Sequence, residues 1–126
     1  MTLIISCEKI PFDFRNKYLG RWEFDVTNSH LTFNTTQGFH DTTSTIRYYG
    51  EINYGSNHGS IMFQSIGYNA EFSIDDNGKI IPLNVNGPNY SESGGFEGSR
   101  IFRYSYYHHM GASREYTGIE IYGVKD

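Results

Sequence analysis

The sequence predicts an all-β protein: an antiparallel meander of about seven or eight strands that closes into a small barrel or a flattened sandwich. Three observations support this fold class. Aromatic residues make up 17% of the chain, with 11 Tyr and 9 Phe, and they favour pleated, half-buried surfaces. Apolar side chains recur at every second position in several segments, which is the period of a strand with one buried face. The 14 glycines supply turns, and no segment shows helical periodicity.

The first predicted strand begins at residue 19, alternates apolar and polar residues, and points three side chains to the core: Trp22, Phe24 and Val26. Residues 28–41 are rich in Thr, Asn and Gly, and we interpret them as a loop or an irregular edge strand. The alternation resumes over residues 43–55. Gly50 falls in the apolar row of this segment, where a glycine marks a bend or a bulge.

Two shorter strands are predicted within residues 60–74, on either side of Gly67. The run Asp75-Asp76-Asn77-Gly78 predicts a turn, because Asn and Gly tolerate a positive φ. Residues 79–85 are expected to pair back, with Pro82 at an edge or a bulge. Residues 86–95 are interpreted as a second long loop.

The last third of the chain predicts the clearest hairpin. In residues 96–109 one face is formed by four aromatic side chains: Phe102, Tyr104, Tyr106 and His108. Residues 110–113 form the turn, and residues 114–125 return with their own alternation. The chain therefore ends in two long antiparallel strands.

The size, charge and cysteine content of the chain exclude several classes of function. The chain of 126 residues is one domain, long enough to bury a single core. A net charge of −4 with ten scattered basic residues argues against nucleic-acid binding. The single cysteine excludes an internal disulfide and a multi-cysteine metal site. No apolar stretch approaches the roughly 20 residues that span a bilayer.

The cysteine lies near the start of the chain, in Leu3-Ile4-Ile5-Ser6-Cys7. This segment resembles the lipobox of bacterial lipoproteins. The resemblance implies that the Cys7 thiol carries a lipid and that residues 1–7 are the remainder of a signal segment, whose basic and apolar parts would lie upstream of Met1. Residues 8–18 are then a linker and residues 19–126 a single β-barrel domain. The alternative is an ordinary N-terminus in which Cys7 is a small buried hydrophobe.

Gly20-Arg21-Trp22, at the entry to the first strand, resembles the Gly-x-Trp signature of lipocalin-like (calycin-type) barrels. The resemblance implies that Trp22 plugs the closed end of a barrel, with Arg114 or Lys125 as its cationic partner. Taken with the lipobox and the closing "GVK", the chain resembles small lipocalin-like lipoproteins of Bacteroidota-type bacteria. That resemblance implies a protein of the cell envelope, held at the outer membrane by its lipid, and it carries no catalytic motif.

A second resemblance concerns anion binding. Arg114-Glu115-Tyr116 resembles the Arg-x-Tyr pair with which intracellular fatty-acid-binding barrels hold a carboxylate, and Arg47 and Tyr49 repeat the spacing. A guanidinium and a phenol two residues apart lie on one side of a strand and can share an anion. The candidate ligand-binding residues are therefore these five: Trp22, Arg47, Tyr49, Arg114 and Tyr116. The alternative is that Arg and Tyr simply alternate on a solvated β face.

We predict no metal site, no cofactor and no catalytic residue. Adjacent His108 and His109 point to opposite faces of a strand and cannot chelate one ion together. The other three histidines offer no His-x-His or His-Glu-x-x-His spacing: His30, His40 and His58. Asp75 and Asp76 lie in a predicted turn, and no serine lies in a Gly-x-Ser-x-Gly elbow.

The sequence thus favours a non-enzymatic binding module of the cell envelope, anchored in a membrane by a lipid on Cys7. A small hydrophobic ligand would require a cavity lined by five apolar residues: Trp22, Phe24, Ile46, Phe72 and Phe102. A partner protein would instead require a filled core and an outward aromatic patch on the 99–122 hairpin. The alternative from another class is a hydrolase or isomerase with a site at the barrel mouth.

Overall fold

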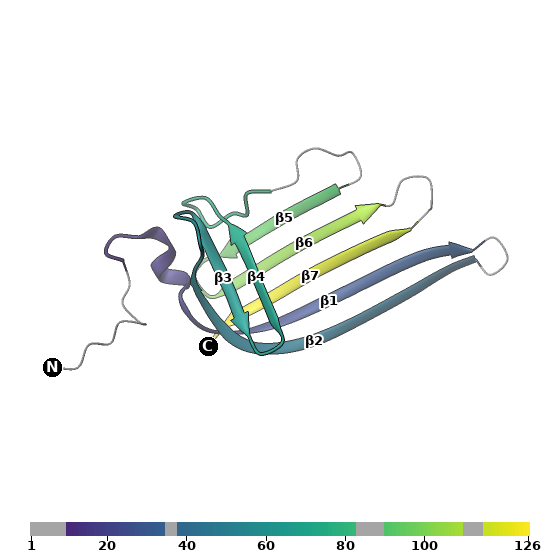
Figure 1. The fold of residues 1–126 in the computed structure, drawn as a ribbon, viewed down its shortest axis with the longest axis horizontal. Helices are drawn as coiled ribbons and strands as arrows, with labels where there is room; N and C mark the ends of the chain where they lie inside the picture. Colours follow the sequence, from purple (N-terminus) through teal and green to yellow (C-terminus); the bar gives the residue numbers. More distant parts are fainter. Residues whose placement is uncertain (1–9, 35–37, 83–89, 110–114) are drawn as a thin grey trace.

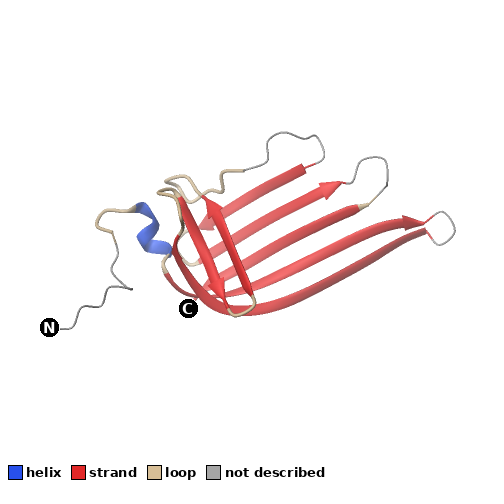
Figure 2. Ribbon diagram, in the orientation of Figure 1, coloured by secondary structure: helices blue, strands red, loops and turns tan. Residues whose placement is uncertain are grey.

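The computed structural model describes residues 10–34, 38–82, 90–109 and 115–126. A short 3₁₀ helix, η1 (Phe14–Tyr18), precedes a single antiparallel sheet (Figure 1). Its strands are β1 (Gly20–Asn34), β2 (Gly38–Tyr54), β3 (Ser60–Ser65), β4 (Tyr68–Ser73), β5 (Tyr90–Glu97), β6 (Ile101–His109) and β7 (Tyr116–Lys125). Figure 2 shows that strands dominate the part of the chain that is described.

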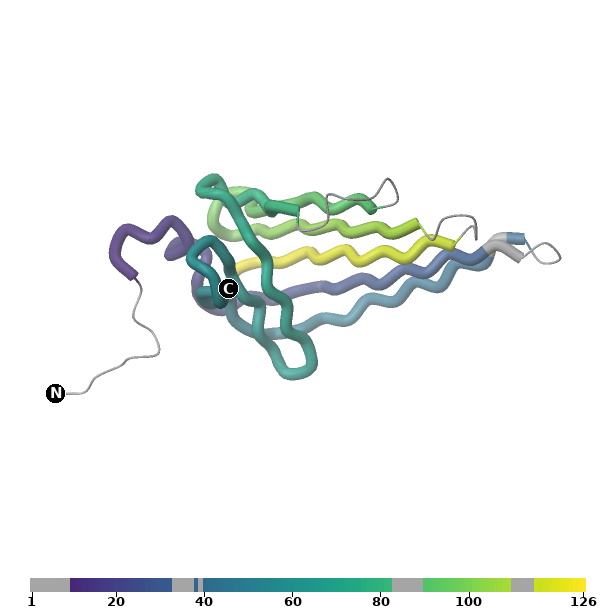
Figure 3. The backbone as a smooth tube through the Cα atoms, turned by 45° about the horizontal axis from the view of Figure 1, so that its top comes forward, coloured from purple at the N-terminus to yellow at the C-terminus, as the bar shows by residue number. Residues whose placement is uncertain are grey.

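The seven strands lie in the order β4-β3-β2-β1-β7-β6-β5. Sequence neighbours pair with each other except β4 and β5, which are the two edge strands, and the ladder between β1 and β7 joins the first and the last strand. The sheet curls into a half-barrel, with the β3–β4 hairpin crossing over one end of the longer strands (Figure 3). The predicted all-β, antiparallel, lipocalin-like architecture of about seven strands is therefore confirmed.

Residues 74–81 link the two edge strands at one end of the half-barrel. Isolated bridges pair Ile74 with Ile80 and Lys79 with Gly95. The amide of Ile81 donates to the carbonyl of Ser73 in β4 at 2.8 Å. On the other side, the amide of Ile80 donates to the Gly94 carbonyl in β5 at 2.9 Å. This segment closes one end of the curled sheet, and the predicted turn at 75–78 forms its tip.

Two predictions of irregular structure are wrong. Residues 28–41 were expected to be a loop or an irregular edge, but β1 continues to Asn34 and β2 starts at Gly38 in unbroken register. The alternation of Trp22, Phe24 and Val26 does not continue there, because the apolar residues of this stretch, Leu31, Phe33 and Phe39, stand at odd instead of even positions. In the expected loop 86–95, residues from Tyr90 onward form most of β5. Serines and glycines dominate this strand, so its sequence carries no strand pattern.

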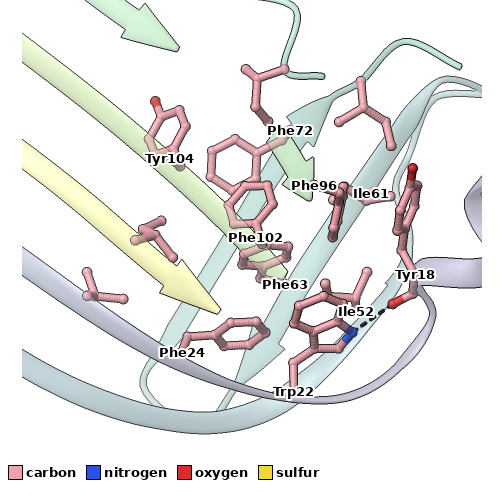
Figure 4. Close-up of a cluster of buried hydrophobic side chains, with 14 residues drawn as sticks. Tyr18, Trp22, Phe24, Ile52, Ile61, Phe63, Phe72, Phe96, Phe102 and Tyr104 are labelled. Carbon is pink, nitrogen blue, oxygen red and sulfur yellow. Dashed lines mark hydrogen bonds between the residues drawn. The ribbon is translucent and has the colours of Figure 1, made fainter. Parts of the chain in front are cut away.

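The core fills the curled end with aromatic side chains (Figure 4). Phe24 stacks on Phe63 with ring centroids 4.5 Å apart, and Phe63 meets the Phe102 ring edge-on at 4.7 Å. All three rings are fully buried. Fourteen hydrophobic residues form the buried cluster: Tyr18, Trp22, Phe24, Val26, Ile52, Ile61, Phe63, Phe72, Ile74, Ile80, Phe96, Phe102, Tyr104 and Ile121.

The core defines two faces of the sheet. The concave face carries Trp22, Phe24 and Val26, as predicted, and the convex face carries the residues between them. Of the five residues expected to line a hydrophobic cavity, Trp22, Phe24, Phe72 and Phe102 pack within the core. Ile46, the fifth, is 50% exposed.

Residues just before the sheet pack against its closed end. Tyr18 is buried, and its ring stacks on Phe96 with centroids 3.8 Å apart. Arg15, 2% exposed, forms a 2.7 Å ion pair with Asp13 and donates to the Ser60 carbonyl at 2.8 Å. The packed structure therefore includes the second half of the segment that we interpreted as a linker. No helix among the described residues is long and apolar enough to cross a membrane.

A candidate binding trough on the concave face

The concave face continues beyond the core. Past Val26, the long strands extend as an open arm that no second layer covers among the described residues (Figure 1). A trough of about 340 Å³ lies on this arm. Its lining residues come from β1, β2, β6 and β7: Asn28, Ser29, His30, Thr42, Ser44, Tyr106, Thr117, Gly118 and Ile119.

The β register sets these side chains in two rows across the arm. In the first row, Asn28 lies opposite Ser44 on β2 and opposite Ile119 on β7. The second row lies two residues further along each strand, about 7 Å away. There His30 lies opposite Thr42 on one side and Thr117 on the other. Each row presents hydrogen-bonding side chains on strands about 4.8 Å apart, and the first row also carries the apolar Ile119.

An aromatic wall flanks these rows on β5 and β6. The Tyr90 ring stacks on His108 with centroids 4.3 Å apart and planes inclined by 4°, and it lies 6.1 Å from the Tyr106 ring. Partial burial raises the pKa of the Tyr106 phenol, and the neighbouring Tyr90 and Glu92 raise it further. The wall therefore offers aromatic faces together with a hydroxyl that stays protonated at neutral pH.

Tyr104 separates the trough from the core. Its ring packs on Phe72 with centroids 4.6 Å apart, while its hydroxyl donates to Glu92 at 2.6 Å. Burial raises the pKa of Tyr104, and the hydrogen bond to Glu92 acts in the same direction. Tyr104 is therefore the point on β6 where the dry aromatic core changes to a polar surface.

The structure places Trp22 inside the core, at the closed end of the half-barrel. Its indole Nε1 donates to the Tyr18 carbonyl at 2.7 Å, as the dashed line in Figure 4 marks. Lys125 lies opposite Trp22 in the β1–β7 register, and its ammonium group donates to the Lys17 carbonyl at 3.0 Å. Arg114, the other expected partner of Trp22, lies outside the described residues.

Arg47 and Tyr49 lie on the convex face, away from the trough. The Arg47 guanidinium holds Asp25 at 2.7 Å and Glu23 at 3.1 Å. The hydrogen bond from Arg47 lowers the pKa of Asp25. Tyr49 is 70% exposed on the same face.

Tyr116 also lies on the convex face, where its ring stacks on His109 at 4.4 Å. The structure therefore does not bring Trp22, Arg47, Tyr49 and Tyr116 together around one ligand. Cys7, the predicted lipidation site, lies outside the described residues.

The carboxyl groups with a lowered pKa lie outside the trough. Three carboxyl groups have a lowered pKa because each accepts hydrogen bonds: Asp13 from Arg15, Asp25 from Arg47, and Glu71 from Ser56 and Ser60. None of the three lines the trough. Within the described ranges, no group of three His, Cys, Asp or Glu residues could hold a metal ion.

Sequence reasoning missed the trough because its residues belong to the segments interpreted as loops or to the polar ends of strands. One signal was available: positions 28, 30 and 32 continue the spacing of positions 22, 24 and 26. Chemically, the trough can accept a ligand that combines an apolar face with hydroxyl or amide groups. Protein-family models, curated proteins and solved structures were compared with the chain, and none matches it.

Proposed function

We propose that this protein is a non-enzymatic binding module that takes a ligand into the concave trough. The observation that carries the proposal is the division of the concave face at Tyr104. On one side of that residue the curled end is filled with aromatic side chains. On the other side an open trough presents hydrogen-bond donors and acceptors next to aromatic faces. A binding surface of this kind needs no reacting group.

The chemistry of the trough favours a ligand of mixed character. Asn28, Ser44 and Thr117 can donate and accept hydrogen bonds, while Tyr106 and Ile119 offer apolar contact. A purely hydrophobic ligand would have to displace a core in which rings such as Phe24 and Phe63 already stack at 4.5 Å. We therefore place the ligand in the trough rather than in the barrel interior.

A lipid on Cys7 would hold the module at the cell envelope, with the outer membrane as the expected site. The support is the sequence Leu3–Cys7 together with the position of the N-terminal segment. Residue 10 lies at the closed end of the sheet, because its amide donates to the Tyr54 hydroxyl at 2.6 Å. A tether attached there leaves the open arm pointing away (Figure 1). Labelling with a lipid precursor should mark the wild-type protein and not the Cys7→Ser variant.

A second candidate is recognition of a partner protein through the convex face. Three tyrosines on the outer side of β6 and β7 favour it: Tyr107, 40% exposed, Tyr116, 44% exposed, and Tyr122, 38% exposed. Exposed tyrosines are typical of protein interfaces, because they give a large contact area at a low entropic cost. These tyrosines would supply the outward aromatic patch expected of a partner-binding protein.

Binding assays on paired variants separate the two candidates. The purified chain is screened by native mass spectrometry against fatty acids, oligosaccharides and short peptides. If the trough binds the ligand, Tyr106→Ala and Asn28→Ala should weaken binding about tenfold or more, and Tyr122→Ala should leave it unchanged. Loss of binding in Tyr122→Ala alone would favour the convex face. Chemical conversion of a bound ligand would support the hydrolase or isomerase alternative instead.

A further inference from the structure

The edge of β2 along the open arm has no pairing partner among the described residues. β2 pairs with β1 from Gly38 to Ile52, but β3 pairs with β2 only from Gly50 onward. The backbone groups of residues 38–49 that point away from β1 therefore face outward. Figures 1 and 3 both show this stretch as the rim of the sheet.

This free edge has few of the features that protect edge strands. Every residue from His40 to Arg47 is exposed, and Ile46 is 50% exposed. Residues 41–47 read Asp-Thr-Thr-Ser-Thr-Ile-Arg, which contains no Pro, Gly or Lys. The two charged residues, Asp41 and Arg47, share the convex face, so the concave side of the edge is uncharged. Long, β-branched, unprotected edges pair with further strands.

We propose that a second copy of this chain pairs with the free edge, forming an antiparallel β2–β2 ladder about a two-fold axis at Ser44. Directly opposed residues in such a ladder point to the same face of the sheet. Because side chains alternate between the two faces, opposed residues must differ by an even number of positions. The two-fold axis therefore passes through a residue and not between two residues. With the axis at Ser44, Thr43 faces Thr45 of the second copy and Thr42 faces its Ile46.

Charge selects this register over its neighbours. Only an axis at Ser44 sets Asp41 opposite Arg47 of the second copy, twice per dimer. A guanidinium has five N–H donors; Asp25 and Glu23 take three of those on Arg47, and Arg47 also hydrogen-bonds the Tyr49 side chain. The Arg47 side chain is 55% exposed, so a remaining N–H can donate to another carboxylate. An axis at Thr43 or Thr45 would leave both charges opposite neutral residues.

The ladder would also complete the trough. Residues 41–47 of the two copies would form about seven backbone hydrogen bonds. Ser44 and Thr42 line the trough beside the free edge. In the dimer, Ser44, Thr42 and Ile46 of the second copy would extend the same concave surface. The two troughs would then form one continuous groove for a longer ligand.

Sedimentation of the full chain over a range of concentrations tests the pairing. We expect a monomer–dimer equilibrium for the wild type. Ser44→Lys sets two ammonium groups against each other at the axis and should weaken dimerisation at least about tenfold. Asn28→Lys is the matched control, because it adds the same charge on the same face one strand away from the edge. It should change the dimer dissociation constant less than about threefold.

Cysteine cross-linking tests the register. In a Cys7→Ser background, Ser44→Cys sets two Cβ atoms about 5 Å apart and should form a disulfide-linked dimer under mild oxidation. Thr42→Cys places its two thiols about 13 Å apart along the strands and should not. The proposal is overturned if the wild type stays monomeric, if both cysteines cross-link equally, or if Asn28→Lys is as damaging as Ser44→Lys. Dimerisation that appears only after deletion of residues 1–9 would overturn it too, since that segment would then occupy the edge.

Discussion

The indole Nε1 of Trp22 donates a hydrogen bond to the main-chain oxygen of Tyr18 at 2.7 Å, and both side chains are at most 2% exposed. This contact joins η1 to the first strand. Tyr18 in turn stacks on Phe96 of β5, on the far edge of the sheet. One buried hydrogen bond therefore joins η1 to β1, and one ring stack joins η1 to β5 at the closed end of the sheet.

Replacing Trp22 with Phe should lower the free energy of unfolding by about 2 kcal/mol. The change leaves the buried Tyr18 carbonyl without its donor and leaves a small void beside Phe24. Urea denaturation monitored by circular dichroism measures the loss. Tyr122→Phe, on the convex face, is the control and should stay within about 0.5 kcal/mol of wild type. A Trp22→Phe variant as stable as wild type would show that the contact contributes nothing.

Stability should fall in acid through Asp13. The hydrogen bond from Arg15 lowers the pKa of this carboxyl from 3.8 to about 2 in the folded protein. A depressed pKa favours the folded state above the unfolded value, so the contribution is complete above about pH 4 and is lost as the pH falls towards 2. The Asp13 side chain is 3% exposed, and the shift corresponds to roughly 2 kcal/mol.

Denaturation curves of wild type and Asp13→Asn between pH 2 and 7 test this contribution, with the pH range set by the two pKa values. The difference in free energy of unfolding should be constant near neutrality and should shrink below about pH 4. A difference that does not change across the whole range would assign the acid sensitivity to other carboxyl groups.

The strands that surround the core could be predicted from the sequence because their two faces differ. Trp22, Phe24 and Val26 alternate with charged residues, and all three are buried as expected. Beyond Val26 the even positions of the same strand become polar, and its apolar residues, Leu31 and Phe33, stand at odd positions, so the pattern that marks the first half of the strand is interrupted. β1 and β2 are nevertheless continuous there, because their backbone pairing does not depend on side-chain polarity.

The candidate site could not be predicted for the same reason. Asn28 and His30 lie where the alternation of the first strand is interrupted. His108 on the predicted last hairpin meets Tyr90 only because β5, most of which was interpreted as a loop, pairs with β6. The Arg47–Tyr49 spacing identified residues on a common face but did not show which face. Both lie on the side opposite Trp22, because their odd positions pair with Asp25 and Glu23.

Gly50 should be required for the curl of β2. A Cβ at this position would clash with the carbonyl oxygen of Gln64 and lie 2.8 Å from the Ser65 Cβ. Gly50→Ala should therefore cost about 1–3 kcal/mol, since β3 must move away. Gly59→Ala is the matched control: its Cβ would approach no atom closer than 3.7 Å, and stability should change by less than about 0.5 kcal/mol. Thermal unfolding of the two variants compares them directly.

Two arginine–aspartate pairs of similar geometry should differ sharply in their effect on stability. Arg15 and Asp13 are both nearly inaccessible to water, and Arg15 also donates to the carbonyls of Asn57 and Ser60. Arg15→Gln would leave these buried acceptors and a buried carboxylate without their partner, which typically costs about 3–5 kcal/mol.

Arg47 holds Asp25 at the same 2.7 Å, yet its side chain is 55% exposed. In Arg47→Gln, water and salt solvate the carboxylates that remain, so the midpoint of urea denaturation should barely move. Raising the salt concentration should reduce even this small loss of stability in Arg47→Gln. The loss of stability in Arg15→Gln should persist, because ions do not reach the buried pair. Equal losses in the two variants would mean that distance, and not burial, governs how these ion pairs stabilise the fold.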